Sequence, residues 1–216
     1  MAITTDQEKT RRRLPRTERE RLIVDEAIRF FAEVGFEGQT RALAQRLGVT
    51  QPLLYRYFPD KEALIERVYQ EVFEGGWDMA WEAVLADRSR PLADRLHEVY
   101  RLYTLENFTY ERVRLFMFAG LKDRAIASRY LSFLRDRLFI PLAREVRAVA
   151  GLPADAPLSE AEIEVASGLH GAIGYVGLRR WVYETAVEVD VPAAVGALID
   201  AFVDGAPATA RALARN

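Results

Sequence analysis

The chain has 216 residues, of which half are hydrophobic and 29% are charged, and its formal net charge is −2. The absence of cysteine excludes disulfides, thiolate metal sites and thiol catalysis, and two histidines are too few for a zinc site without carboxylates. The first 22 residues are polar and charged, and no run approaches the roughly 18–20 apolar residues of a membrane span. We therefore expect a cytoplasmic protein with no membrane segment, metal or cofactor.

The charge is unevenly distributed. Through residue 61 there are 12 Lys and Arg against 9 Asp and Glu, whereas the remainder has 18 against 23. The basic excess is concentrated near the start of the chain, at Lys9, Arg11, Arg12, Arg13 and Arg16. This asymmetry suits a small module that faces phosphates, attached to a larger acidic body.

Apolar residues recur at helical spacing along the chain, and no strand-like alternation persists, so we predict an all-α fold. The first helix should open with a capping box at Thr17 and Glu20 and close at Gly35. The next start signals are expected at Thr40, Thr50 and Asp60, each as the cap of a helix.

Longer helices are expected beyond residue 85. One covers roughly 128–149 with a kink at Pro141, and another begins at the capping box of Ser159 and Glu162 and continues to about residue 186. The last helix should open at Asp190 and end at about residue 204, with the remaining residues frayed.

Two short helices joined by a glycine-containing turn, after a longer amphipathic helix, indicate a helix-turn-helix module. In the segment Gln51 to Phe58, Leu54 and Phe58 define the face toward the core, while Pro52 and Arg56 lie nearly opposite. Eight residues span about 12 Å, which matches the width of the major groove of DNA. An outward face of this composition fits contact with DNA better than contact with water.

The stretch "TRALAQRLGVTQPLLYRYFPDKEALIERV", preceded by "FFAEVGFEG", resembles the helix-turn-helix signature of the TetR (tetracycline repressor) family of transcriptional regulators. The resemblance covers roughly residues 19–72 and rests on the paired "LA", the "GVT" turn, "LYRYF" and "DKEAL". It implies a homodimeric DNA-binding regulator with an N-terminal domain at 1–64 and a helical domain for effector binding and dimerisation at 65–216. It also implies base contacts from the start of the recognition helix.

Side-chain chemistry gives each outward residue a role in binding double-stranded DNA. Arginine forks onto guanine or clasps phosphate, glutamine pairs with adenine, apolar groups contact thymine methyls, and hydroxyls and lysine reach phosphates. The predicted DNA-binding residues are Arg41, Thr50, Gln51, Pro52, Leu53, Tyr55, Arg56, Tyr57 and Lys61. The alternatives are that Tyr57 and Leu53 are packed inside the domain and that Lys61 is a solvated charge.

Four glycines recur at three-residue spacing inside a predicted helix, at Gly168, Gly171, Gly174 and Gly177. Each costs a helix about 1 kcal/mol relative to alanine, so a close approach to another helix should compensate. The resemblance implies that this helix and the last one form the dimer interface. The alternative is close packing within one chain.

The larger domain contains many aromatic residues, which form either a core or the wall of an apolar pocket. We name Tyr100, Tyr103, Phe116, His170 and Tyr175 as candidate pocket residues for an apolar or aromatic effector, with His170 as a hydrogen-bond partner. A histidine satisfied inside the helical bundle is the alternative.

The leading hypothesis is a DNA-binding transcriptional regulator, a repressor that binds a palindromic operator as a homodimer and is released by a small molecule. A second hypothesis is a DNA-binding dimer that has no effector, and a large cavity in the body would separate the two. The third, a helical enzyme, is disfavoured because the sequence has no nucleophile motif, phosphate loop or histidine–carboxylate cluster.

Overall fold

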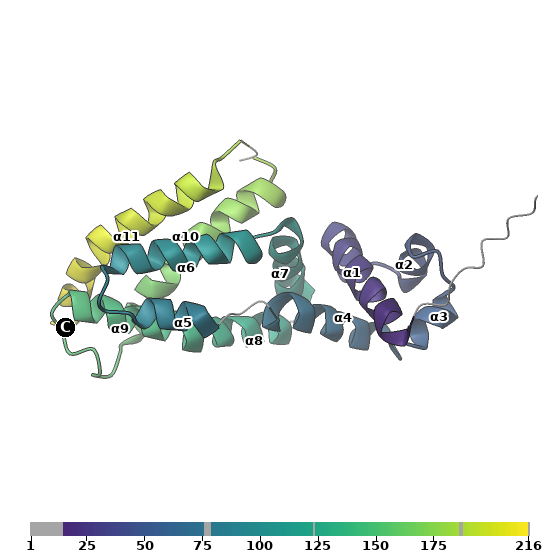
Figure 1. Cartoon of the computed structure of the whole chain (residues 1–216), viewed down its shortest axis with the longest axis horizontal. Coiled ribbons are helices and arrows are strands. Elements are labelled where there is room, and N and C mark those ends of the chain that lie inside the picture. The colour runs from purple at the N-terminus through teal and green to yellow at the C-terminus, as the bar shows by residue number, and fades with distance from the viewer. Residues whose placement is uncertain (1–14, 76–78, 123, 186–187, 216) are drawn as a thin grey trace, which may run out of the picture.

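The computed structural model describes residues 15–75, 79–122, 124–185 and 188–215, and these ranges contain helices and no strand. The predicted all-α class is confirmed. The elements in chain order, shown in Figure 1, are α1 (Arg16–Val34), α2 (Thr40–Arg46), α3 (Gln51–Tyr55), α4 (Lys61–Tyr69), the π-helical turn η1 (Gln70–Glu74), α5 (Met79–Ala86), α6 (Leu92–Glu106), α7 (Tyr110–Lys122), α8 (Arg124–Leu134), the π-helical turn η2 (Arg135–Phe139), α9 (Ile140–Val149), α10 (Glu160–Trp181) and α11 (Val191–Leu213).

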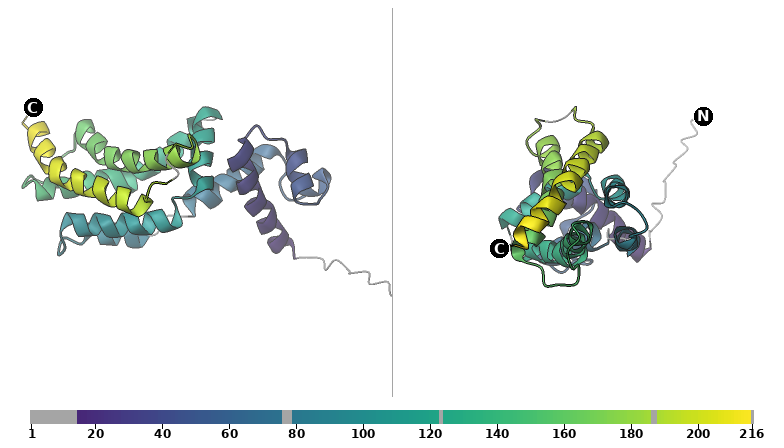
Figure 2. Two further views of the ribbon diagram at one scale, coloured as in Figure 1. Left: turned by 90° about the horizontal axis from the view of Figure 1, so that it is seen from above. Right: turned by 90° about the vertical axis from the view of Figure 1, so that its left-hand side faces the viewer.

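The molecule is elongated, with α1, α2 and α3 at one end and the helices from α5 onward forming a larger body at the other (Figure 1). The helix α4, continued by η1, runs from the small end toward the body. The predicted boundary between the two domains, after residue 64, lies inside α4. The division of the chain into two domains at this point stays a prediction. In the body, α10 and α11 lie side by side, and α11 also packs against α6 and α9 (Figure 2).

The small end has its own apolar core. Leu54 and Phe58 are 1% and 5% exposed, which confirms that this face of the recognition segment is turned inward. Leu43 of α2 is buried with them, whereas Leu47 and Val49 are half-buried. The core holds α3 against α1 and leaves its opposite face outside.

The N-terminal signals of the helices were predicted with mixed success. Asp60 accepts a hydrogen bond from the backbone N–H of Ala63 at 2.7 Å, and the reciprocal capping box of Ser159 and Glu162 is present. Asp190 caps α11 through the N–H of Ala193, as expected.

Three other capping predictions are wrong in whole or in part. The capping box at Thr17 is absent, because α1 already begins at Arg16 after Pro15 and includes Thr17 in its first turn. Gln39 rather than Thr40 is the N-cap of α2. Thr50 occupies the N-cap position of α3, but its side chain makes no capping hydrogen bond.

The region 128–149 contains an interruption close to where a kink was expected. The π-helical turn η2 directly precedes Pro141, which lies in the first turn of α9 where its missing N–H is tolerated. The N–H of Ile140 bonds to the carbonyl of Arg135, five residues earlier. The π-type turn therefore absorbs the irregularity.

Both C-terminal helices differ from the expected lengths. The helix α10 ends at Trp181 rather than near residue 186, and α11 continues through Pro207 to Leu213 instead of ending near residue 204. The extension past Pro207 is stabilised by packing, because Ala206, Pro207 and Ala210 are buried and α11 contacts α9. This burial offsets the hydrogen bond that proline removes.

Candidate nucleic-acid interface and effector cavity

The outward face of α3 is exposed as expected. Pro52 and Arg56 are exposed, Tyr55 is 38% exposed, and Thr50 at the start of the helix is exposed. Leu53 is half-buried, so part of its side chain packs within the domain and part is exposed to solvent. The exposed face of α3 therefore presents the ring of Pro52, the phenol of Tyr55 and the guanidinium of Arg56 within about one and a half helical turns.

A buried threonine holds α3 at both ends. The Thr40 hydroxyl accepts a hydrogen bond from the Gln51 amide nitrogen at 2.9 Å, and it lies 2.9 Å from the Tyr55 hydroxyl. Thr40 is buried at the start of α2, so its function is to fix the recognition helix rather than to cap its own helix. Gln51 and Tyr55 are consequently pre-positioned, and each retains further hydrogen-bonding capacity for a base or a phosphate.

The cations of this domain fall into two groups. On the surface formed by α1 and α2 away from α3, Arg46 bonds Glu26 at 2.8 Å and also pairs with Glu33, while Arg29 bonds Glu26 at 2.7 Å. Within the described part of the chain, neither Arg41 nor Arg56 has a hydrogen-bond or ion-pair partner. Arg41 at the start of α2 and Arg56 at the end of α3 are thus available to contact a DNA backbone.

The remaining predicted DNA contacts occupy intermediate positions. Lys61 is half-buried in the first turn of α4, and Tyr57 is half-buried with the guanidinium of Arg16 lying 5.9 Å from its ring centroid. Arg16 begins α1 at the end of the basic N-terminal stretch. Lys9, Arg11, Arg12 and Arg13 lie outside the described residues.

The four spaced glycines of α10 separate into two kinds. A Cβ placed on Gly168, Gly171 or Gly174 would meet no atom within 4 Å, so these positions are open within the protomer. A Cβ on Gly177 would lie 2.8 Å from the Phe108 ring, so this glycine serves close packing within the chain. The alternative of close packing within one chain thus applies to Gly177, and the dimer interface stays a prediction for the glycines of α10.

A cavity of about 640 Å³ lies in the body between α7, η2 and α10, with further walls from α6, η1 and α8. This volume is within the usual range for a site that binds a drug-sized ligand. Four of the five candidate pocket residues line it: Tyr103, Phe116, His170 and Tyr175. Tyr100 does not. It is buried behind the wall, with its hydroxyl 3.5 Å from Nδ1 of His170.

His170 faces the cavity from α10 and is surrounded by aromatic rings. The centroids of Tyr103 and Phe139 lie 5.2 and 5.7 Å from its own. Burial, and secondarily the positive charge of Arg112, lowers the pKa of His170 to about 4. The imidazole is therefore neutral near pH 7, and it can offer a ligand one hydrogen-bond donor or acceptor.

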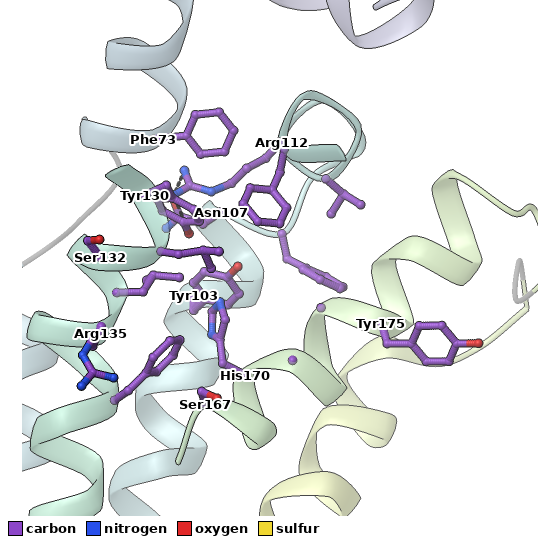
Figure 3. Close-up of a pocket in the computed structure, with 18 of the residues that line it drawn as sticks. Phe73, Tyr103, Asn107, Arg112, Tyr130, Ser132, Arg135, Ser167, His170 and Tyr175 are labelled. Carbon is purple, nitrogen blue, oxygen red and sulfur yellow. Dashed lines mark hydrogen bonds between the residues drawn. The ribbon is translucent and has the colours of Figure 1, made fainter. Parts of the chain in front are cut away.

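Several wall residues were missed from the sequence. Among them are Asn107, Arg112 and Tyr130, which lie together at one end of the cavity (Figure 3). The available signal was a pair of arginines within the apolar segment "ERVRLFMFAGL". Because Arg112 and Arg114 are two residues apart in a helix, they point to nearly opposite sides of α7. The sequence did not reveal which side faced a cavity.

The geometry defines a helix-turn-helix module attached to a helical body that contains a cavity. Residues 23–68 match the family model described as "Bacterial regulatory proteins, tetR family". This match spans α2, α3 and most of α1 and α4, and thus the whole candidate interface.

Solved structures extend the likeness to most of the chain at low sequence identity. A TetR-like transcriptional regulator from Rhodococcus sp. RHA1 superposes with a TM-score of 0.64 at 21% identity, over 88% of this chain and 96% of that one. A putative TetR-family transcriptional regulator from Mesorhizobium loti MAFF303099 has a TM-score of 0.56 at 16% identity, over 88% and 98%. A tetR-family transcriptional regulator from Streptomyces coelicolor has a TM-score of 0.58 at 14% identity, over 92% and 90%. At these identities the likeness establishes the fold.

Residues 23–68 therefore form an N-terminal domain of the TetR-family type, and over the rest of the chain the likeness is one of fold. The predicted resemblance to the TetR family is confirmed for these residues.

Proposed function

We propose that the protein is a repressor that binds a palindromic operator as a homodimer and is released when a small molecule occupies the cavity of the body. The observation that carries the proposal is the position of α7. One face of this helix forms a wall of the cavity, and its other face contacts the end of α1 in the candidate DNA-binding domain. A ligand that changes the position of α7 must therefore act on α1.

The contacts of α7 with the DNA-binding domain are specific. Arg114 donates hydrogen bonds to the carbonyl oxygens of Ala32 at 2.6 Å and Glu33 at 3.2 Å, which are the free carbonyls at the end of α1. The Phe118 ring packs on Gly35, where a Cβ would approach it to 3.1 Å, and Lys122 donates to the carbonyl of Phe36. Polar and apolar contacts thus fix the C-terminal end of α1 to one face of α7.

The opposite face of α7 lines the cavity through Arg112, Val113 and Phe116. Arg114 also donates to the carbonyl of Trp181 at the end of α10, whose other residues form the facing wall. A ligand that fits the cavity better when α7 and α10 have shifted would weaken DNA binding by linkage. The cavity favours this proposal over a DNA-binding dimer without an effector.

Dimerisation is supported by the character of α11. Its sequence has a mean hydropathy of 1.3 over its most apolar 18 residues, yet only 22% of that window is buried within the protomer. By length and composition this helix passes the test for a membrane span, contrary to the prediction that no segment approaches one, but a single such helix is weak support for a membrane location. Because α11 packs on α6, α9 and α10, its remaining apolar face suits a second copy of the chain.

A dimer also follows from the size of the reading module. One helix-turn-helix buries too little surface for useful specificity, and two copies read half-sites about one helical turn apart. The operator should accordingly be a palindrome, and the protein should act in the cytoplasm, where its DNA lies.

The test begins with selection of bound duplexes from random DNA, followed by fluorescence anisotropy of the enriched palindrome over a range of salt concentrations. Arg56→Ala should weaken binding by about 1–3 kcal/mol, and Lys61→Ala should reduce the salt slope by about one unit. The matched control is Arg29→Ala, since Arg29 is exposed but paired with Glu26 on α1 away from α3. Equal effects of Arg56→Ala and Arg29→Ala would refute the interface.

The effector arm screens small molecules for release of the bound palindrome. Phe116→Trp, which reduces the cavity, should abolish release by the active compounds without changing operator affinity in their absence. Release that survives this substitution would contradict the assignment of the effector to the cavity.

A further inference from the structure

One end of the cavity contains a group of polar side chains beside several aromatic rings. Asn107, Arg112 and Tyr130 lie together there, with Tyr103 and His170 next to them (Figure 3). The rest of the wall combines apolar side chains, among them Phe108, Phe116 and Phe139, with serines, Arg135 and Glu164. These five residues, called here the polar end, determine the kind of ligand head group that the cavity can hold.

Arg112 places a positive charge in the polar end that the protein does not neutralise. Its guanidinium donates to the Val72 carbonyl, to Oδ1 of Asn107 at 2.8 Å and to the Tyr130 hydroxyl at 3.3 Å, and it lies 5.2 Å from the centroid of Phe73. In the described ranges of the chain it has no ion pair with a carboxylate. The carbonyl oxygens and the phenol accept hydrogen bonds from the Arg112 guanidinium, but because they are neutral they do not compensate its positive charge.

The other arginine of the cavity wall differs in this respect. Arg135 bonds Glu160 at 2.7 Å, so its charge is already paired. The carboxylate of Glu164, which also lines the cavity, is exposed and receives a hydrogen bond from Ser167. Glu164 is thus exposed and Arg135 is paired, whereas Arg112 has no carboxylate partner, which orients an amphipathic anion with its charge at Arg112.

Two donors of the polar end have no partner. Nδ2 of Asn107 and Nε of Arg112 are buried and make no hydrogen bond, and Asn107 is only 3% exposed. In the described residues two further buried atoms share this condition, but they belong to Arg95 and Arg179, which do not line the cavity. A buried donor without an acceptor costs about 1–3 kcal/mol, so the polar end lacks an acceptor and not a donor.

The neighbouring groups do not supply a competing charge. Burial raises the pKa of Tyr100 and of Tyr103, so both phenols stay protonated. His170 is neutral near pH 7, because burial and the adjacent Arg112 lower its pKa. Arg112 is therefore the one charged member of the polar end, and a single negative charge would match it.

We propose that the effector is an apolar or aromatic carboxylic acid, bound as its carboxylate with the oxygens at Arg112 and Asn107 and the hydrocarbon body among Phe108, Phe116 and Phe139. This inference rests on the proposed function, since it names the ligand of the same cavity. A carboxylate supplies the missing acceptors and one negative charge, and Arg binds it with charge-assisted hydrogen bonds. The body can be aliphatic or aromatic, and the two possibilities are separate arms of the test.

The test uses two matched probe pairs that differ only in the head group: dodecanoate with dodecanamide, and 2-naphthylacetate with 2-naphthylacetamide. Isothermal titration calorimetry of the full chain at pH 7 measures each dissociation constant. At least one acid should bind about tenfold or more tightly than its amide, and the pair that shows this identifies the body as aliphatic or aromatic. Equal affinities in both pairs, or no binding by either acid, would overturn the inference.

Variants assign the preference to the polar end. Arg112→Met should remove the difference between acid and amide, whereas Arg135→Met, which alters the paired arginine of the same wall, should retain it. Asn107→Asp is the second variant, because it introduces a carboxylate beside Arg112 and should exclude acids while still admitting amides. Circular dichroism and operator affinity without ligand verify that each variant is folded, and an acid preference that persists in folded Arg112→Met or Asn107→Asp would refute the site.

Operator release separates this inference from the proposed function. A neutral compound that binds in the cavity and releases DNA would uphold effector control and refute the acid assignment. An acid that binds through Arg112 but leaves the operator complex intact would uphold the acid site and refute effector control.

Discussion

The close approach at Gly177 gives a quantitative test of the packing between α10 and α7. An added Cβ at this position would lie 2.8 and 2.9 Å from two atoms of the Phe108 ring and 3.0 Å from Cγ2 of Val113. Phe108 is buried, and its ring centroid is 5.1 Å from that of Trp181, so it has little space in which to move away. Gly177→Ala should therefore introduce overpacking that costs about 1–3 kcal/mol.

The matched control is Gly168→Ala in the same helix. A Cβ there would meet nothing within 4 Å, so this variant should gain about 1 kcal/mol from the higher helix propensity of alanine. Because the gain in propensity is common to both variants, the difference between them isolates the steric cost. Gly177→Ala should be less stable than Gly168→Ala by about 1–3 kcal/mol.

The assay is urea unfolding followed by circular dichroism, with the slope of the transition compared between the variants. Sedimentation velocity under the same conditions verifies that both variants have the same association state, since Gly168 is also predicted to lie at the dimer interface. In thermal unfolding, each kcal/mol should appear as a shift of about 2–4 °C for a chain of this length. A difference below about 0.5 kcal/mol, or a more stable Gly177→Ala, would show that the approach of α10 to Phe108 is not as close as described.

Three further outcomes are expected. Asp60→Ala should lower the free energy of unfolding by about 1 kcal/mol because the N–H of Ala63 loses its cap, whereas Asp60→Asn, which keeps an acceptor, should be nearly neutral in urea unfolding. The pKa of His170 is lowered from 6.5 to about 4 in the folded state, so the free energy of unfolding should fall by at most about 3 kcal/mol as the pH decreases from about 6.5 to 4. His170→Asn should lack this loss. An unchanged pH profile in that variant would contradict the buried neutral imidazole. The hydrogen bond from Arg147 lowers the pKa of Glu162 to about 2, so this carboxylate should contribute stability at neutral pH that is lost as the pH falls from about 4.5 to 2. In chemical unfolding at pH 7, Glu162→Ala should be destabilised by about 3 kcal/mol or more. A loss of less than about 1 kcal/mol would refute the importance of this buried pair.

The recognition module could be predicted from the sequence because its signals are local. The alternation of Leu54 and Phe58 with Pro52 and Arg56 follows from the helical period, and the cap at Asp60 depends on a residue three positions away. Such relations need no knowledge of the rest of the chain. They sufficed for the fold class, for the buried face of α3 and for the resemblance of this module to the TetR family.

Local signals failed where tertiary contacts competed with them. Thr40 was expected to cap α2, but its hydroxyl instead joins Gln51 to Tyr55, which are 11 and 15 residues away. Pro207 was expected to follow the last helix, yet burial against α9 continues α11 beyond it. In each case the interaction that decided the conformation is made with a residue that sequence spacing does not bring near.

The cavity of the body shows this division most clearly. The sequence by itself determined that aromatic residues and His170 share a helical body, because composition and periodicity are properties of the chain. Only the tertiary structure decided that Tyr100 lies behind the wall, that Gly177 packs against Phe108, and that Arg112 turns into the cavity while Arg114 grips α1. The physical reason is that a cavity is enclosed by helices distant in sequence, so the side of α7 that borders it is fixed by how those helices pack.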